Sequence, residues 1–413
     1  MGYNRGAFNM LSVTEARERI LSNFQTTAAE SIPLIASANR VLAIDVSAAQ
    51  DFPLFDNSAM DGFVIRSEDT SASRVSLKVV ADIPAGSTPK VTLQPGEAAR
   101  IMTGAQVPAG ANAVIPVEDT DFHNHAAGTT APEVISFERP VKAGENIRPR
   151  GMDIHAGEIV LKKGQTLKPQ DLGLLAMLGF ANVQVYKKPR IALLSSGDEL
   201  LAVDAPLESG KIRDSNSYTL AASIESAGSE VIRLGVARDT RESVEALFQK
   251  ALSENVDLIL SSAGVSVGAF DYVKEVIEAN GSLNFWRVNM RPGKPLTFGK
   301  YFDKQFIGLP GNPVSAFVGF EVFVRPVLER LSGKLESSRR RIKVRSEEEI
   351  ESDGRESYLR AKLREENGIQ IAQLTGHQGS GNLLSLVQAD ALLIIPAGVK
   401  CVPAGQEVEA LLL

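Results

Sequence analysis

The sequence predicts a multidomain α/β protein: a central doubly wound, mostly parallel sheet domain, with a helical linker, a small all-β domain and a C-terminal β-barrel-like domain. Three observations support this fold class. Apolar runs alternate with amphipathic helical segments between residues 189 and 332, as in parallel sheets covered by helices on both faces. Short apolar runs between Gly, Pro and Asp turns fill residues 53–140, and strand-like runs return after Gly333. The 413 residues correspond to about three domains of roughly 150 residues.

Two helices are predicted outside the central domain. Residues 13–25 carry a helical pattern of apolar positions, with Thr14 as the candidate N-cap and Arg17 and Arg19 on the outer face. Residues 169–179 form the second helix, and its final Gly179 suits the left-handed conformation that often ends helices.

The central domain is predicted as strand–helix repeats followed by a hairpin-like segment and a long helix. The strands are expected at 190–196, 230–238, 257–264 and 283–290, the helices at 216–228, 240–255 and 271–281, the hairpin-like segment at 295–310 and the long helix at 313–333.

The strand-like runs after Gly333 predict a small β domain. Asn367-Gly368 between two of these runs is a signal for a two-residue hairpin. The basic run Arg339–Arg341 and the acidic run Glu347–Glu349 are interpreted as a solvated edge strand, in preference to a binding patch.

Composition excludes several classes of protein. The chain has 44 Lys and Arg against 50 Asp and Glu, a formal charge of −6, which disfavours general nucleic-acid binding. No apolar run approaches the roughly 18 residues of a membrane-spanning helix. Cys401 is the one cysteine, so no intrachain disulfide forms, and a reducing cytoplasmic location is expected. With only four histidines, a Cys/His zinc site is not expected, and His123 and His125 are interpreted as surface residues.

Candidate binding residues gather where the predicted strands end. Ligands of doubly wound sheets bind beyond the carboxyl ends of the strands. The loops GVSVG at 264–268 and GNPVS at 311–315 each precede a helix, and Lys294 lies in the turn RPGKP. Each loop alone is explained by tight turns and helix caps. Together, beside Lys294, they predict a phosphate or oxyanion site.

Three acidic residues, Glu199, Asp239 and Asp271, are expected at the same edge of the sheet. One interpretation is that they hold a divalent cation that bridges phosphates, as oxygen ligands hold Mg²⁺. The other is helix capping, because Asp239 and Asp271 directly precede predicted helices. The two roles can coexist.

Seven motifs lie along the chain in a fixed order. They are FDNSAMDGF, RIMTGAQVP, GENIRPRGMDIHAG, LLSSGDELL, GVSVGAFDY, RPGKPLTFGK and GLPGNPVSA. Together they resemble the molybdopterin molybdotransferase family, which comprises bacterial MoeA and the E domain of gephyrin. The resemblance runs from about residue 10 to the C-terminus, with the motifs in matching order.

The resemblance implies four domains: a discontinuous linker and dimerisation domain at 10–52 and 145–188, a small β domain at 53–144, a molybdopterin-binding type of α/β domain at 189–332 and a C-terminal β domain at 333–413. It also implies a cytoplasmic, Mg²⁺-dependent homodimer that inserts molybdate into adenylylated molybdopterin and releases AMP. The molybdopterin adenylyltransferase is a further expected partner; nucleic acid and membranes are not.

The site residues expected from the loops and from the resemblance fall into three groups. The catalytic group is Asp61, Asp153, Asp239, Asp271 and Lys294; the substrate-binding group is Thr103, Glu199, Ser262, Gly264, Ser266, Gly268, Arg287, Arg291, Pro310, Gly311, Asn312, Pro313, Ser315 and Ser380, within the matching loop of Gln378, Gly379, Ser380 and Gly381; the metal group is Glu199, Asp239 and Asp271.

Departures from the family pattern make the ligand geometry harder to predict than the reaction. Ala263 stands where the family often has glycine, Ala269 where it commonly has glutamate, and Arg287 and Arg291 where lysine is frequent. Two other functions remain open: an adenylyltransferase, which shares the central domain type, and an assembly scaffold like gephyrin. Consumption of ATP would distinguish the first from an enzyme that needs molybdate and releases AMP.

Overall fold

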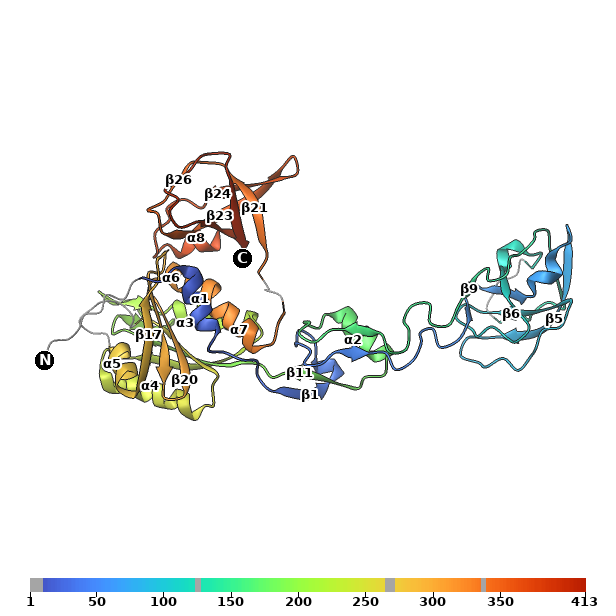
Figure 1. The fold of residues 1–413 in the computed structure, drawn as a ribbon, viewed down its shortest axis with the longest axis horizontal. Coiled ribbons are helices and arrows are strands. Elements are labelled where there is room, and N and C mark those ends of the chain that lie inside the picture. Colours follow the sequence, from blue (N-terminus) through green and yellow to red (C-terminus); the bar gives the residue numbers. More distant parts are fainter. Residues whose placement is uncertain (1–9, 123–127, 264–271, 336–338) are drawn as a thin grey trace. The chain divides into compact units, whose positions relative to one another are not determined.

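The computed structural model describes residues 10–122, 128–263, 272–335 and 339–413. Two compact units are present, and they are drawn in Figure 1. The first combines the chain up to Ile44 with Lys163–Leu413, and the second is Asp45–Lys162. The four-domain division stays a prediction.

A six-stranded mixed sheet forms the centre of the first unit, as predicted (Figure 1). Its order is β15 (Glu230–Ala237), β12 (Arg190–Ser196), β16 (Leu258–Ser262), β20 (Lys304–Leu309), β19 (Pro295–Tyr301) and β17 (Gly281–Arg287). The first four strands are mutually parallel, and β19 is antiparallel to both of its neighbours. The predicted hairpin-like segment is therefore the antiparallel pair β19 and β20.

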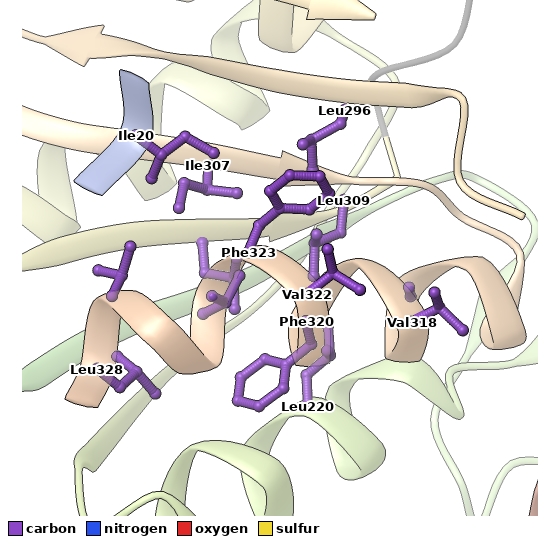
Figure 2. Close-up of a cluster of buried hydrophobic side chains, with 14 of the residues drawn as sticks. Ile20, Leu220, Leu296, Ile307, Leu309, Val318, Phe320, Val322, Phe323 and Leu328 are labelled. Carbon is purple, nitrogen blue, oxygen red and sulfur yellow. The ribbon is translucent and has the colours of Figure 1, made fainter. Parts of the chain in front are cut away.

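Helices cover both faces of this sheet because successive strand residues point to opposite sides. Leu193 of β12 packs in one apolar cluster and Leu194 in the other. The first cluster is covered by α1 (Val13–Leu21), α3 (Asn216–Ser226), α6 (Pro313–Gly319) and α7 (Arg325–Leu331); the second is covered by α4 (Arg241–Ser253) and α5 (Tyr272–Asn280). Figure 2 shows Phe323 pointing toward Leu309 and Ile307 of the sheet.

The long helix predicted at 313–333 is not continuous. A π-helical turn, Phe320–Val324, separates α6 from α7. Pro326 lies in the first turn of α7 and has no N–H to donate to the preceding turn, so a wider turn before it accommodates the missing hydrogen bond.

Two helix caps differ from those predicted. The N-cap of α1 is Ser12, whose hydroxyl accepts the Glu15 N–H while the Glu15 carboxylate accepts the Ser12 N–H, so Thr14 is not the cap. The N-cap of α4 is Thr240, which accepts the Ser243 N–H, so Asp239 does not cap this helix. The sequence pattern located both helices but missed each cap by one or two residues.

Five strands near the C-terminus close into a barrel. Their order is β23 (Glu356–Glu366), β24 (Ile369–Leu374), β21 (Arg341–Ser346), β27 (Glu407–Leu412) and β25 (Ala391–Ile395), and β25 pairs again with β23. Asn367 and Gly368 join β23 to β24 with φ of 51° and 77°, which confirms the predicted hairpin. A short strand, β18 (Met290–Arg291), adds to the outside of β23, and a short helix, α8 (Leu383–Val387), precedes β25.

The predicted edge position of the strand at Arg339–Arg341 is wrong, although Arg340, Arg341 and the acidic run Glu347–Glu349 are exposed as predicted. Strand β21 lies between β24 and β27, because a closed barrel leaves no edge. Arg339 binds the buried carboxylate of Glu321, and Glu347 binds the Arg364 guanidinium.

Early and later segments of the chain pair with each other before the central domain begins. Strand β1 (Ala29–Pro33) is antiparallel to β11 (Asn182–Tyr186), next to α2 (Pro169–Met177). Gly179 follows α2 with φ of 87°, as predicted for its end. This pairing brings the two segments side by side within the first unit.

The second unit contains a five-stranded sheet with apolar clusters on both faces. Its order is β7 (Ala113–Pro116), β4 (Gly62–Ile65), β6 (Glu97–Ile101), β5 (Val75–Ile83) and β8 (Val134–Phe137). The same unit contains two short antiparallel pairs outside this sheet. They are β2 (Val46–Ser47) with β10 (Ile159–Leu161), and β3 (Asn57–Ser58) with β9 (Ile147–Arg148). The predicted small all-β domain is confirmed.

Two predictions made from composition concern membrane helices and the single cysteine. Every helix in the described ranges is too short or too polar to cross a lipid bilayer. Cys401 is exposed. His123 and His125 lie outside the described residues.

Candidate functional site

A buried polar network lies at the carboxyl edge of the central sheet, where the sequence predicts ligand binding. The Asn216 amide of α3 donates to the Ser262 hydroxyl at 2.7 Å and to the Gly311 carbonyl at 2.7 Å. Ser262 ends β16, and Gly311 lies between β20 and α6. The structure therefore brings together two predicted site residues through Asn216, a residue that was predicted only as a helix start.

Asp214 orients the start of α3 from the turn before it. Its carboxylate accepts the Ser217 N–H at 3.0 Å and the Ser217 hydroxyl, and that hydroxyl lies 3.0 Å from the Ser195 hydroxyl at the end of β12. The polar run Asp214–Ser217 at the start of α3 was a usable signal for such a cluster, because four small polar residues in succession exceed what one cap requires.

Carboxylates gather at the ends of β12 and β15. Asp198 and Asp239 accept each other's backbone N–H, at 3.3 and 3.2 Å. The Glu199 carboxylate lies over Gly197, where an added Cβ would stand 2.5 Å from Glu199 Oε2. The Glu199 side chain is exposed and could move, so it is the φ of 148° that favours glycine at position 197. The structure places Glu199 and Asp239 at neighbouring strand ends.

The donor chemistry of this acidic edge suits a hard cation such as Mg²⁺, which prefers carboxylate oxygens. Among the residues that the structure describes, however, no three His, Cys, Asp or Glu side chains are grouped so as to hold a metal. Asp271, the third predicted ligand, lies outside the described residues. So do Gly264, Ser266 and Gly268 of the predicted anion loop and Ala269, one of the departures from the family pattern.

Ala263 is strained at the entrance to that loop. Its φ is 72°, in the left-handed region that glycine adopts without cost. A Cβ added to Gly311 would stand 3.3 Å from the Ala263 Cβ, so the two segments are in tight contact. Ala263, which stands where the family often has glycine, therefore lies against Gly311.

The second predicted loop begins a helix. Pro313 occupies the first turn of α6 and Asn312 is its N-cap, without a side-chain hydrogen bond to the helix. Ser315 and Pro310 are buried. The Val314 N–H donates to the Ser380 carbonyl at 3.0 Å, so the loop from the C-terminal barrel reaches this helix start.

The turn RPGKP lies beside the same helix. Gly293 has φ of 104°, and a Cβ there would be 3.6 Å from the Ser315 carbonyl oxygen. Arg287 and Lys294 are exposed, and within the described part of the chain Lys294 has no ion pair. Arg291 lies 4.0 Å from the Asp353 carboxylate. The positive side chains of this turn are therefore largely free to bind an anion.

Arg360 of β23 is a candidate site residue that was not predicted from the sequence. It is fully buried: Nε donates to the Ser385 hydroxyl at 3.0 Å and Nη2 to the Gly379 carbonyl at 3.0 Å, while Nη1 has no partner. Burial, followed by repulsion from Arg291, lowers the pKa of Arg360 to about 10. It stays charged at neutral pH, and a carboxylate partner for it is absent from the described residues.

The loop 376–381 is held by the same residue. The Arg360 N–H donates to Gln378 Oε1 at 2.9 Å, and Gln378 Nε2 donates to the Arg360 carbonyl at 3.1 Å. A sequence signal for the burial of Arg360 was available. Arg360 lies two positions after the buried Tyr358 in β23, so the two side chains point to the same face of the strand.

Asp61 and Thr103, predicted together in the second unit, are in contact. Asp61 Oδ1 accepts the Thr103 N–H at 2.6 Å and the Thr103 hydroxyl at 2.7 Å. These bonds, the backbone one first, lower the pKa of Asp61, so it is ionised at neutral pH. Gly62 beside it is required by close packing, because a Cβ would stand 2.1 Å from the Ile115 carbonyl oxygen.

Asp153 lies in an exposed turn of the same unit. Its carboxylate binds Arg148 Nη2 at 2.5 Å, and its N–H donates to the Phe52 carbonyl at 2.9 Å. It does not hydrogen-bond to Asp61 or Thr103. Nearby, Asp51 accepts Arg150 Nε at 2.8 Å and the Ala156 N–H at 2.9 Å.

The fold is that of a multidomain α/β protein in which polar residues at the edge of the central sheet lie beside a loop of the C-terminal barrel. Residues 11–179 match the MoeA N-terminal region (domain I and II), 192–330 a probable molybdopterin binding domain, and 343–413 the MoeA C-terminal region (domain IV).

Similar proteins span nearly the whole chain. A molybdopterin molybdenumtransferase from Nostoc sp. is 40% identical and covers 92% of this chain and 87% of its own, and one from Haemophilus influenzae is 36% identical and covers 97% and 98%. A molybdopterin biosynthesis MoeA structure from Pyrococcus horikoshii OT3 is 31% identical, with a TM-score of 0.83, covering 98% of this chain and 100% of that one. The chain belongs to the MoeA family, which confirms the resemblance.

Proposed function

We propose that this protein is a molybdopterin molybdenumtransferase, which inserts molybdate into adenylylated molybdopterin and releases AMP in the cytoplasm. Relatives with that name at 36–40% identity support the assignment. The structural observation that carries it is Arg360, a buried guanidinium with an unpartnered Nη1 beside the Ser380 loop. Burying an unpaired charge is costly unless a ligand completes it, and an oxyanion does so.

Two groups of residues at the carboxyl edge of the central sheet would bind two different anionic groups. Arg360, Arg291 and Lys294 supply cations for the molybdate oxygens. Backbone and side-chain donors near Ser262, Gly311 and Asn312 receive the phosphates of the substrate. In this reaction a water oxygen bonds to one phosphorus as the phosphorus–oxygen–phosphorus link breaks, so that molybdopterin keeps its phosphate and AMP leaves. The fixed donors would stabilise the charge that develops on the leaving phosphate.

Mg²⁺ would be held by Glu199, Asp239 and Asp271 and would neutralise phosphate charge when bound. The support is the chemistry of the donors: carboxylates at adjacent strand ends, and an Asp239 that is released from helix capping by Thr240. Asp239→Asn keeps the hydrogen bond to the Asp198 N–H but removes the charge. We expect normal melting, and AMP release that no longer rises with Mg²⁺ concentration.

The active protein is proposed to be a homodimer in which Asp61 and Thr103 of one subunit complete the site of the other. An ionised, exposed Asp61 oriented by two hydrogen bonds supports a role toward a ligand. Mixing inactive Asp61→Asn and Asp271→Asn subunits should restore one intact site per heterodimer. Verified subunit exchange without recovered activity would contradict the shared site.

The decisive assay measures AMP release from adenylylated molybdopterin with and without molybdate, together with ATP consumption. We expect release that depends on molybdate and no use of ATP. Lys294→Ala should weaken substrate binding about tenfold, because a hydrogen bond to a charged group contributes roughly 1.5–3 kcal/mol. ATP consumption with molybdopterin would instead identify an adenylyltransferase and overturn the proposal.

A further inference from the structure

Asn216 connects three chain segments at the carboxyl edge of the sheet. It is 8% exposed and lies in the first turn of α3. Its two amide hydrogens are used in full: one goes to the Ser262 hydroxyl at the end of β16, the other to the Gly311 carbonyl before α6, each at 2.7 Å. A carbonyl oxygen can only accept, so the amide must face Gly311 with its NH₂ group.

The Gly311 carbonyl is fixed from one side while the N–H groups of its loop stay available. Within the described residues, the N–H groups of Gly311 and Asn312 have no acceptor. A peptide's C=O and N–H groups point in opposite directions. Holding the carbonyl inward on Asn216 therefore turns the following N–H outward, toward an anion.

The base of α3 keeps Asn216 in place independently of any ligand. Asp214 binds the N–H and hydroxyl of Ser217, and Ser217 lies 3.0 Å from the Ser195 hydroxyl. The Asp214 N–H also donates to the Leu201 carbonyl at 3.0 Å. These contacts fix the first turn of α3, so the hydrogen bonds of Asn216 are not needed to form the helix.

We propose that Asn216 is a positioning residue of the substrate site: its amide holds the Gly311 carbonyl and the Ser262 hydroxyl so that the loop N–H donors face the phosphate groups of the substrate. The inference rests on the proposed function for the identity of the substrate. The positioning role inferred from the hydrogen bonds of Asn216 needs only that the ligand be an anion.

Asn216→Asp is the sharpest test because it keeps the shape and exchanges two donors for acceptors. A carboxylate facing the Gly311 carbonyl repels it, and burial raises the pKa of the introduced acid. At pH 8 we expect at least a tenfold loss of affinity for AMP and for inorganic phosphate, measured by calorimetry, and a rise in KM for AMP release. As the pH falls toward 5.5 the acid gains a proton and one donor, so affinity should partly return.

Asn280→Asp is the matched control. The Asn280 amide donates to the Val276 carbonyl at the end of α5, away from the sheet edge, so its variant should bind and turn over as the wild type does at every pH. If Asn216→Asp does not fold, Asn216→Ser keeps one shorter donor and should show an intermediate loss of affinity with a wild-type melting temperature.

Three results would overturn the inference: wild-type affinity in either Asn216 variant, a loss in Asn216→Asp that is independent of pH, or no binding of either probe by the wild type. If the wild-type protein binds AMP but does not form AMP from adenylylated molybdopterin in the presence of molybdate, the proposed function is contradicted. In that case the inference on Asn216 stands on the binding data alone.

Discussion

Two buried arginine clusters in the first unit differ in what completes them. At the π-helical turn, the fully buried Glu321 carboxylate accepts Arg325 at 2.6 and 2.8 Å and Arg339 at 2.9 and 3.0 Å. In the barrel, Arg360 is equally buried but binds only neutral oxygens and leaves Nη1 without a partner. The first cluster is complete within the chain. The second has no carboxylate partner among the described residues, which is why we propose that its charge is reserved for an anionic ligand.

The largest expected effect is on stability, at the complete cluster. Glu321→Gln removes the charge that the buried Arg325 binds, and breaking a buried pair costs roughly 3–5 kcal/mol. Denaturant unfolding should show this loss. Glu409→Gln is the control, because Glu409 and Arg341 are both 45% exposed, and an exposed pair contributes at most about 1 kcal/mol. Equal losses in the two variants would remove the contrast.

At the incomplete cluster the expected effect is on activity. Arg360→Met should lower molybdate-dependent AMP release about 100-fold, the size of effect seen when one preorganised donor to developing charge is removed. The free energy of unfolding should change by no more than about 1 kcal/mol, because the lost hydrogen bonds are offset by removal of a buried, unpaired charge. Arg364→Met, on the barrel surface, is the control. Normal AMP release in Arg360→Met would make this arginine a structural residue.

The dependence of stability on pH should also differ between the clusters. Burial acts to raise the pKa of Glu321, but the hydrogen bonds from Arg325 and Arg339 outweigh it and hold the pKa below 4.5. Since the folded pKa is the lower one, this contribution is complete above about pH 4.5 and is lost as the pH falls through the folded value. The free energy of unfolding of Glu321→Gln should therefore fall less steeply below pH 4.5 than that of the wild type. Parallel curves would contradict the assignment.

A smaller effect is expected from backbone strain beside the ligand edge. Ala263→Gly should raise stability by about 1 kcal/mol, because glycine adopts φ of 72° without the penalty that a Cβ carries. Ala227→Gly, at an ordinary helical φ of −77°, should lower stability instead. Thermal melting of both variants measures the two signs. Destabilisation by Ala263→Gly would mean that the Cβ contact with Gly311 outweighs the strain.

The sequence by itself determined the elements and their order. Alternation of apolar runs with amphipathic helices predicted the strands β12, β15, β16 and β17, since period and burial follow from local pattern, whereas β20 was predicted only within the hairpin-like segment. Asn367-Gly368 specified its hairpin through the positive φ that these residues tolerate. The same rules placed Glu199 and Asp239 at one edge, because parallel strands end on the same side.

Tertiary structure decided what local pattern cannot encode. Closure of the barrel turned a predicted edge strand into an interior one, and it buried Arg360 with the loop of Gln378, which lies 18 residues away. The pairing of Arg339 with Glu321 and the reach of Asn216 to Gly311 join residues 18 and 95 positions apart. Such contacts depend on which segments meet in space, and each polar group's partner is fixed only when burial removes water as the alternative.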